Sequence, residues 1–164
     1  MNSKNKGNSF ERKIANRLSV RFELITGIKQ SFRRNPDSGS FFGGTNQKRT
    51  ITHNIEKASF GDIICPGNFV YNIECKHYSK SPSFSSILSQ NVKQLDDWIK
   101  QAEQDSKNIN KKLAIIIKYN NVEEFVLVDE LISNKVHITY KNYFLITLTH
   151  FLDLPDNIFF KEID

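Results

Sequence analysis

The feature that most constrains the fold is an apolar run in the second half of the chain, Leu113-Ala-Ile-Ile-Ile-Lys-Tyr119. It has the length of a strand and no alternating polar positions, which predicts a strand buried on both faces. Such a strand needs neighbouring strands beside it and helices over both faces of the sheet. The run therefore predicts an α/β domain.

Two amphipathic segments can supply the covering helices, because apolar residues recur in both at every third or fourth position. The first extends from about Asn8 to Ile25 and ends at Gly27, and the second extends from about Ser85 to Ser106. Their apolar positions are Phe10, Ile14, Leu18 and Phe22 in the first, and Leu88, Val92, Leu95, Ile99 and Ala102 in the second. In the second helix we expect Trp98 to pack near the stripe and Gln101 to face solvent.

The remaining strands are predicted from β-rich segments between turn residues. Gly61–Cys65 and Phe69–Lys76 flank a Pro66-Gly67-Asn68 turn and predict a hairpin. Further strands are predicted at 28–34, 125–128, 136–140 and 143–148, with a helical turn near 150–154. The order of elements predicts a mixed central sheet flanked by helices, in a single domain over residues 1–164. Residues 35–58 are predicted to be a long basic loop, which at that length points to a function.

Charge is distributed unevenly along the chain, which carries +5 overall. Residues 1–60 contain 12 Lys and Arg against 4 Asp and Glu, a balance of +8, and residues 61–164 contain 11 against 14, a balance of −3. A basic segment of this kind fits a polyanionic partner, and it equally fits a solvated surface without one.

Several classes of protein are excluded by the sequence. No segment approaches the roughly 20 apolar residues of a membrane helix, and the polar start lacks a secretory signal, so we expect an intracellular, cytoplasmic protein without a membrane partner. Two cysteines cannot form a disulfide framework, and Cys65, Cys75 and His77 match no common zinc spacing. The glycines of 43–48 are misplaced for a phosphate loop, so no nucleotide cofactor is expected.

A group of polar residues on the hairpin points to chemistry. In the second arm Glu74 and Lys76 alternate with apolar Cys75, and a three-residue loop would pair Cys65 with Phe69 and set Asp62 opposite Asn72. Asp62 and Glu74 would then share a face as diagonal neighbours roughly 7 to 8 Å apart, which suits a bridging Mg²⁺. A lysine beside them can stabilise negative charge on a phosphate. The alternative is a solvent-facing strand with a weak ion pair.

These residues resemble the motif of the PD-(D/E)xK nucleases. Asp62 follows Gly61, and eleven residues separate it from Glu74-Cys75-Lys76, a pattern similar to that of the superfamily. Lys6-Gly7-Asn8-Ser9-Phe10-Glu11-Arg12, Arg33-Arg34 and Ser38-Gly39 are similar to archaeal-type Holliday junction resolvases. The resemblance implies a restriction-endonuclease-like fold over roughly residues 4–118, while the segment between Gly39 and Gly61 is longer and the strands after 120 are extra.

The resemblance also implies roles for individual residues. The catalytic group would comprise Glu11, Ser38, Asp62, Glu74 and Lys76, and the metal-binding group would comprise Glu11, Asp62, Glu74 and Cys75. The DNA-binding residues would be Lys6, Arg33, Arg34, Lys48, Arg49 and Lys80. Glu11 also fits a second interpretation, because it lies three residues after Asn8 and could belong to a helix-capping arrangement.

The function predicted from the sequence is that of a Mg²⁺-dependent endodeoxyribonuclease, with Mn²⁺ as the other candidate ion. The preferred role is a Holliday junction resolvase that makes paired nicks in four-way junctions as a homodimer. A restriction-like or repair endonuclease acting on duplex or flap DNA is the alternative within the same chemistry. A DNA-binding module that does not cleave is the alternative from another class.

Overall fold

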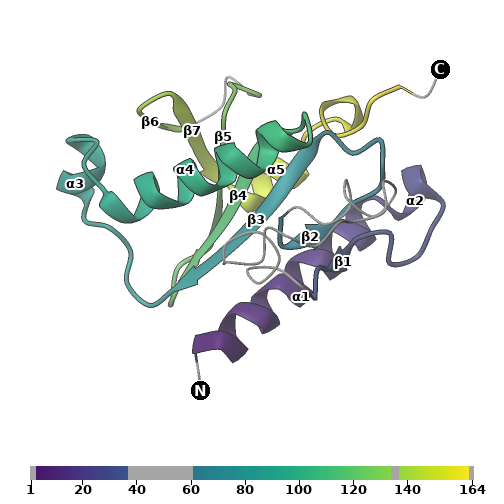
Figure 1. Cartoon of the computed structure of the whole chain (residues 1–164), viewed down its shortest axis with the longest axis horizontal. Helices are drawn as coiled ribbons and strands as arrows, with labels where there is room; N and C mark the ends of the chain where they lie inside the picture. Colours follow the sequence, from purple (N-terminus) through teal and green to yellow (C-terminus); the bar gives the residue numbers. More distant parts are fainter. Residues whose placement is uncertain (1–2, 37–60, 134–136, 163–164) are drawn as a thin grey trace.

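The computed structural model describes residues 3–36, 61–133 and 137–162. Its main feature is a five-stranded mixed sheet in the order β3-β4-β5-β7-β6 (Figure 1). These strands are β3 (Tyr71–Tyr78), β4 (Lys112–Tyr119), β5 (Glu124–Val128), β7 (Tyr143–Thr147) and β6 (Ile138–Tyr140). β3 and β4 are parallel, and the other neighbouring pairs are antiparallel. The predicted α/β fold with a mixed central sheet is confirmed.

Helices cover both faces of this sheet, and each face has its own apolar cluster. α4 (Lys93–Asn108) covers one face, while α1 (Ser3–Arg21) and α5 (Leu148–Leu152) cover the other (Figure 1). Along β4, Leu113, Ile115 and Ile117 join the α4 cluster, whereas Ala114 and Ile116 join the cluster beneath α1 and α5. β4 lies between β3 and β5, so the prediction that it is buried on both faces is confirmed.

The first predicted helix is present but longer at its start. α1 begins at Ser3, not near Asn8, and α2 (Glu23–Thr26) continues it to Gly27, which ends it with a left-handed φ of 65°. Because α1 starts so early, Glu11 lies in the helix interior, and the capping interpretation of Glu11 is wrong. The Glu11 carboxylate pairs instead with Arg34 Nε at 2.6 Å.

The second predicted helix is divided into α3 (Phe84–Leu88) and α4. Between them Gln90 has a φ of 53°, and the N–H of Val92 donates to the Tyr140 hydroxyl at 2.9 Å instead of to a helical carbonyl. Leu88 is therefore exposed, and its predicted place in the apolar stripe is wrong. The other apolar positions of the stripe are buried as predicted.

The predicted hairpin pairing is also wrong. The short strands β1 (Arg33–Arg34) and β2 (Ile63–Ile64) pair with each other, and β3 pairs with β4. The Pro66-Gly67-Asn68 turn does form, since the N–H of Phe69 donates to the Pro66 carbonyl at 3.0 Å. Phe69 then forms a β-bridge with Phe160 and not with Cys65. The strand that follows, β3, pairs in parallel with β4 instead of forming a hairpin.

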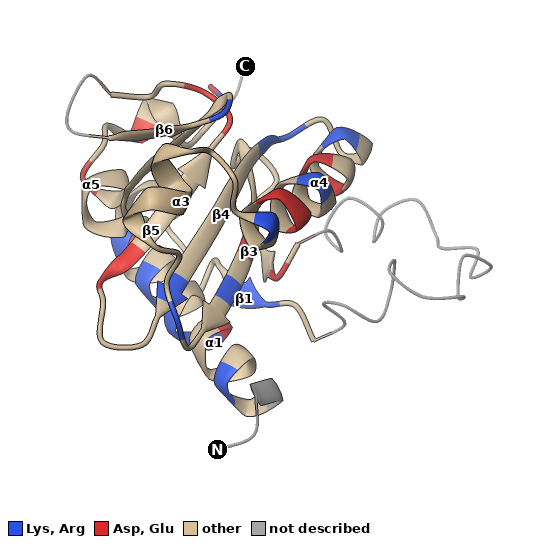
Figure 2. Ribbon diagram, turned by 90° about the vertical axis from the view of Figure 1, so that its left-hand side faces the viewer, with Lys and Arg blue, Asp and Glu red and all other residues tan. Residues whose placement is uncertain are grey.

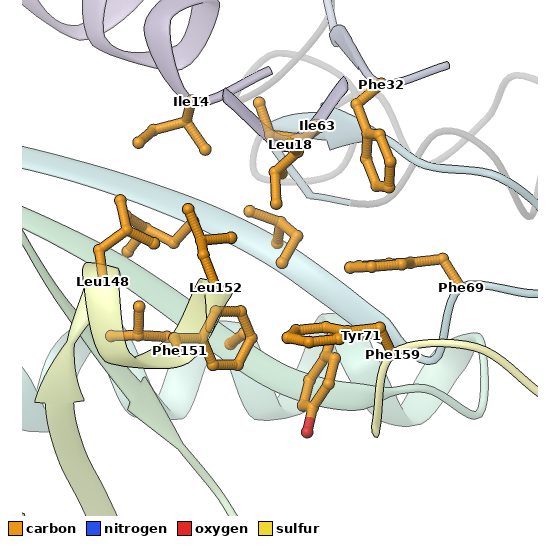
Figure 3. Packing of buried hydrophobic residues seen from close by; sticks show 14 of the residues in the cluster. Ile14, Leu18, Phe32, Ile63, Phe69, Tyr71, Leu148, Phe151, Leu152 and Phe159 are labelled. Atoms are coloured by element: carbon orange, nitrogen blue, oxygen red, sulfur yellow. The ribbon is translucent and has the colours of Figure 1, made fainter. Parts of the chain in front are cut away.

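The last residues of the described chain complete the core. The N–H of Val70 donates to the Phe159 carbonyl at 2.8 Å, just before β3. The Phe159 ring packs against Phe22 with centroids 4.8 Å apart. It also packs against Phe151, with centroids 5.0 Å apart (Figure 3). The C-terminal strands and η2 (Asp156–Ile158) therefore belong to the same packed unit as α1 and β3. Within the described ranges, no helix has both the length and the apolar character needed to cross a bilayer.

Candidate active site

The polar face of β3 is directed toward α4, and its residues are buried. Tyr71, Ile73 and Cys75 join the apolar cluster on the α1 side, so the intervening residues face α4. Asn72 and Glu74 are only 3% and 4% exposed, although both are polar. Because burying a polar group costs free energy unless it is paired, the buried polar face of β3 makes Glu74 a candidate for a functional residue.

Asp62 is held at the outer edge of β3 by two hydrogen bonds. Its backbone N–H donates to the Ile73 carbonyl, and its carboxylate Oδ2 accepts from the Cys75 N–H, both at 2.8 Å. The two bonds occupy edge groups on either side of Glu74. Asp62 is therefore close enough for its charge to act on Glu74, and it lies there through an edge contact with β3 and not through the predicted cross-strand pair with Asn72.

Gly61 allows this close approach. It has a φ of 78°, and a Cβ at this position would lie 2.5 Å from Asn72 Oδ1 and 2.7 Å from the Ile73 carbonyl oxygen. Asn35 fixes the same segment from the other side, since its side-chain amide donates to the Gly61 carbonyl at 3.0 Å and its N–H donates to the Asp62 carbonyl at 2.8 Å. A side chain at position 61 would displace Asp62.

The charges at this edge influence one another. Burial and then the negative charge of Asp62 raise the pKa of Glu74 to about 8, although Lys76 acts in the opposite direction. Lys76 Nζ lies 3.3 Å from Glu74 Oε2. Burial alone would lower the pKa of Lys76, but Glu74 and Asp62 together raise it, so the ammonium form is favoured. Two carboxylates and one ammonium therefore share a partly dehydrated site.

Glu11 of α1 brings a third carboxylate to the site. Burial and the charge of Asp62 raise its pKa, while Arg34 lowers it. Arg34 Nε donates to Glu11 Oε2 at 2.6 Å, and a second guanidinium nitrogen donates to Asn8 at 2.9 Å. Arg34, which the sequence predicted to bind DNA, is thus engaged in holding Glu11 beside Asp62.

α4 contributes two residues that sequence reasoning missed. Gln101 is exposed, as expected, and its Oε1 also accepts from Lys76 Nζ at 3.3 Å. Asp105, one turn further along α4, has a pKa raised by burial, and its charge also raises the pKa of Glu74. Their i, i+4 spacing on the flank of the apolar stripe is the signal in the sequence that could have found them.

Cys75 serves the site through its backbone. Its thiol is buried in the apolar cluster, and burial raises the thiol pKa well above its ordinary value, with further increases from Asp62, Glu74 and Glu11. The sulfur is accordingly directed away from the polar face of β3, whereas the N–H positions Asp62. Cys65 and Cys75 are both free thiols.

The predicted DNA-binding residues are only partly described. Arg33 on β1 and Lys80 after β3 are exposed, and Lys6 on α1 is half-buried. Figure 2 shows β1, β3 and α4 on one side of the molecule, with β6 and α5 on the other. Ser38, Lys48 and Arg49 lie outside the described residues, as does most of the predicted 35–58 loop.

The donor set fits a divalent cation. Mg²⁺ prefers carboxylate oxygens, needs only one or two of them from the protein, and keeps several waters. Asp62 and Glu74 offer such oxygens, and a cation bound between them would offset the burial and the Asp62 charge that together raise the pKa of Glu74. Within the described residues no three acidic, histidine or cysteine side chains form a complete metal cluster. Water and substrate oxygens would have to complete the coordination.

Comparison with known proteins assigns the chain to a family. A family model described as "Phage putative PDDEXK endonuclease" matches residues 2–159, nearly the whole chain. Searches of curated proteins and of solved structures found no match. The match includes the strands after 120 and therefore extends beyond the segment that carries the sequence resemblance. The chain belongs to this phage PDDEXK endonuclease family, and thus to the PD-(D/E)xK nucleases.

Proposed function

We propose that this protein is a divalent-metal-dependent DNA endonuclease whose active centre is formed by Asp62, Glu74 and Lys76. The observation that carries the proposal is the convergence of these three side chains at one edge of β3, where Glu74 is buried beside the charges of the other two. A solvent-facing ion pair on a strand would not require a carboxylate that is 4% exposed.

Each residue has a distinct part in phosphodiester hydrolysis. Asp62 and Glu74 would hold the cation, which when bound lowers the pKa of water and neutralises charge on the phosphate. Lys76, kept protonated by its acidic neighbours, donates hydrogen bonds to the phosphate or to the attacking water. Gln101 accepts from the Lys76 ammonium and so limits its rotation. Glu11 adds a carboxylate whose position depends on Arg34.

For the substrate, we propose a branched DNA, with the four-way junction as the first candidate. The support is the similarity of residues 6–12 and of Arg33-Arg34 to archaeal-type Holliday junction resolvases. Paired cuts on strands related by twofold symmetry call for two active centres in a homodimer. Mg²⁺ is the proposed ion because the donors are hard oxygens, and Mn²⁺ shares that preference.

Substitution of Glu74 tests the proposed centre. Glu74→Ala should abolish metal-dependent cleavage while junction binding, measured by gel shift in EDTA, stays within about threefold, because phosphate contacts dominate affinity. Asp97→Asn is the matched control, since Asp97 is an exposed acid on α4 that pairs only with Lys93 among the described residues. Full cleavage by Glu74→Ala would refute the assigned centre.

Comparison of four substrates tests the specificity. Four-way junction, flap, single strand and linear duplex are incubated in Mg²⁺ and in Mn²⁺, and the products are mapped on a sequencing gel. Symmetric paired nicks in the junction support a resolvase. Cleavage confined to duplex or flap would support the restriction-like or repair alternative, and binding without cleavage of any substrate would support a non-cleaving module.

A further inference from the structure

An exposed aromatic side chain continues the polar face of β3 beyond the active centre. Glu74, Lys76 and Tyr78 are alternate residues of one strand, so their side chains share the face toward α4. Tyr78 is the last residue of β3 and is 46% exposed. The Cα of Tyr78 lies roughly 6.6 Å along the strand from that of Lys76, at about 3.3 Å per residue.

The contacts between β3 and α4 place Tyr78 in line with the centre. Asn72 donates to Ser106, and Lys76 donates to Gln101. Tyr78 continues the same series with Trp98, whose ring centroid is 5.0 Å from that of Tyr78. β3 and α4 thus run side by side in opposite directions, so that later residues of β3 contact earlier residues of α4.

Trp98 makes the Tyr78 ring a supported platform. Trp98 is 7% exposed and packs in the apolar cluster under α4, so it gives Tyr78 a fixed neighbour on one side. Tyr78 itself keeps 46% of its surface exposed to solvent. Lys76 and the exposed Lys80 lie two residues before and after Tyr78, so the chain carries a cation on either side of the aromatic residue.

We propose that Tyr78, supported by Trp98, binds an unpaired nucleobase of the DNA strand whose phosphate lies at Lys76. An aromatic ring between cations is the arrangement that single-strand-binding surfaces use, with bases stacked on the ring and phosphates near the cations. Bases inside a duplex are already stacked and are not available to such a ring. The substrate class is therefore DNA with an unpaired nucleotide next to the cleaved bond.

This inference rests on the proposed function for the position of the phosphate, but binding can be measured without cleavage. Trp98 is the sole tryptophan of the chain, so its fluorescence reports directly on this platform. In EDTA, a short oligo(dT) should quench Trp98 emission, whereas an oligomer of equal length made of abasic nucleotides should bind more weakly and quench less. Equal binding of the two oligomers would overturn the proposal, because only charge would then be recognised.

Variants at position 78 separate stacking from folding. Tyr78→Ala should weaken oligo(dT) binding about tenfold, since loss of one base–aromatic stack has an effect of that order. Tyr78→Phe should bind as the wild type does, because the ring is retained. Phe84→Ala is the control, as Phe84 is a more exposed aromatic on α3. Unchanged binding by Tyr78→Ala, with a native circular dichroism spectrum, would also overturn the proposal.

Cleavage assays separate this inference from the proposed function. On a flap or junction, Tyr78→Ala should lower kcat/KM about tenfold, and an abasic nucleotide beside the cut should reduce the wild type to the level of the variant. Normal cleavage by Tyr78→Ala on every substrate would overturn the proposal for Tyr78 and leave the proposed nuclease function standing. Oligo(dT) binding that depends on Tyr78, without cleavage of any substrate, would support base binding by Tyr78 and reject the proposed nuclease function.

Discussion

Gly61 determines where Asp62 lies, since a Cβ there would meet Asn72 Oδ1 at 2.5 Å and the Ile73 carbonyl at 2.7 Å. We expect Gly61→Ala to lower the free energy of unfolding by about 2 kcal/mol or more, because a left-handed φ alone costs an L-residue about 1–2 kcal/mol. The cleavage rate should also fall, and by more than the loss of folded protein explains, because Asp62 moves with the segment. Urea denaturation and a cleavage assay on the same preparation measure the two effects.

Gly67→Ala is the matched control for this change. Gly67 lies in the turn before β3, and a Cβ there would have no atom within 4 Å among the described residues. Its stability and activity should stay close to the wild type, within about 0.5 kcal/mol. If both glycine variants behaved alike, the close approach at Gly61 would not be what positions Asp62.

Tyr119 offers a second prediction at the level of one residue. Its hydroxyl is buried and has no hydrogen-bond partner among the described residues, and burial raises its pKa to about 12. Tyr119→Phe removes this unsatisfied group, so the free energy of unfolding should be unchanged or higher by about 1 kcal/mol. Urea denaturation measures it.

Tyr140→Phe is the opposite case and serves as the control. The Tyr140 hydroxyl accepts from the Val92 N–H at 2.9 Å and contacts Asp96 Oδ1 at 3.0 Å. Its removal leaves a buried N–H without a partner and should cost about 1–3 kcal/mol. A loss at Tyr119 as large as at Tyr140 would mean that the Tyr119 hydroxyl is satisfied in solution.

Residues of the site differ in how far the sequence could reveal them. Glu74 and Lys76 could be predicted because strand alternation alone decides their face. Asp62 was predicted from a hairpin register that does not form, and its actual contact with β3 could not be predicted, since it depends on which strand edge is left open. Gln101 and Asp105 were missed because the rotation of α4 against β3 is a tertiary property.

Among the elements, local signals predicted the type of structure better than its partners. Periodicity was sufficient for α1, α4 and β4, where each segment carries its own apolar pattern. The hairpin prediction was wrong although the turn itself is present, because the segments on either side of the turn pair elsewhere. β2 pairs with β1, and β3 pairs with β4. The division of the second helix followed from Val92, whose N–H bonds to Tyr140 of a strand distant in sequence.

Glu124 of β5 connects the sheet to α1 through ion pairs. It lies 2.6 Å from Lys13 Nζ and 3.3 Å from an Arg17 nitrogen, both on α1. Burial would raise its pKa, but the Lys13 hydrogen bond and the nearby cations outweigh burial and hold the pKa below its ordinary value of 4.5. Glu124 therefore stabilises the fold above that value, and the contribution disappears as the pH falls through the lowered pKa.

Glu124→Gln should accordingly reduce the free energy of unfolding at pH 7 by about 0.5–1 kcal/mol, a small value because Lys13 is largely exposed. The difference from the wild type should shrink as the pH is lowered below 4.5. Urea denaturation across this pH range measures it, with Asp97→Asn as the control for an exposed pair. A difference that persists in acid would assign the effect to packing.

For the whole molecule, the uneven charge predicts how DNA is held. The excess of 12 basic over 4 acidic residues lies in residues 1–60, which include α1 and β1. The acidic centre draws Asp62 and Glu74 from residues 61–164 and Glu11 from residues 1–60. Phosphates would therefore be attracted mainly by the basic residues of the first part of the chain and cleaved at carboxylates that lie beside it, which fits binding by charge and shape more than by base sequence.

Arg33 and Arg34 test this distribution, because adjacent residues of one strand have different surroundings. Arg33 is exposed, whereas Arg34 pairs with Glu11 at 2.6 Å. Arg33→Ala should make the slope of log Kobs against log salt less negative by about 1, because one phosphate contact is lost. Arg34→Ala should change this slope less and lower cleavage more, since it releases Glu11 beside Asp62. Fluorescence anisotropy of labelled junction DNA in EDTA gives the slopes, and cleavage in Mg²⁺ gives the rates. If Arg34→Ala changed the slope as much as Arg33→Ala and left cleavage intact, Arg34 would exchange Glu11 for phosphate when DNA binds, and Glu11 would have no part in the centre.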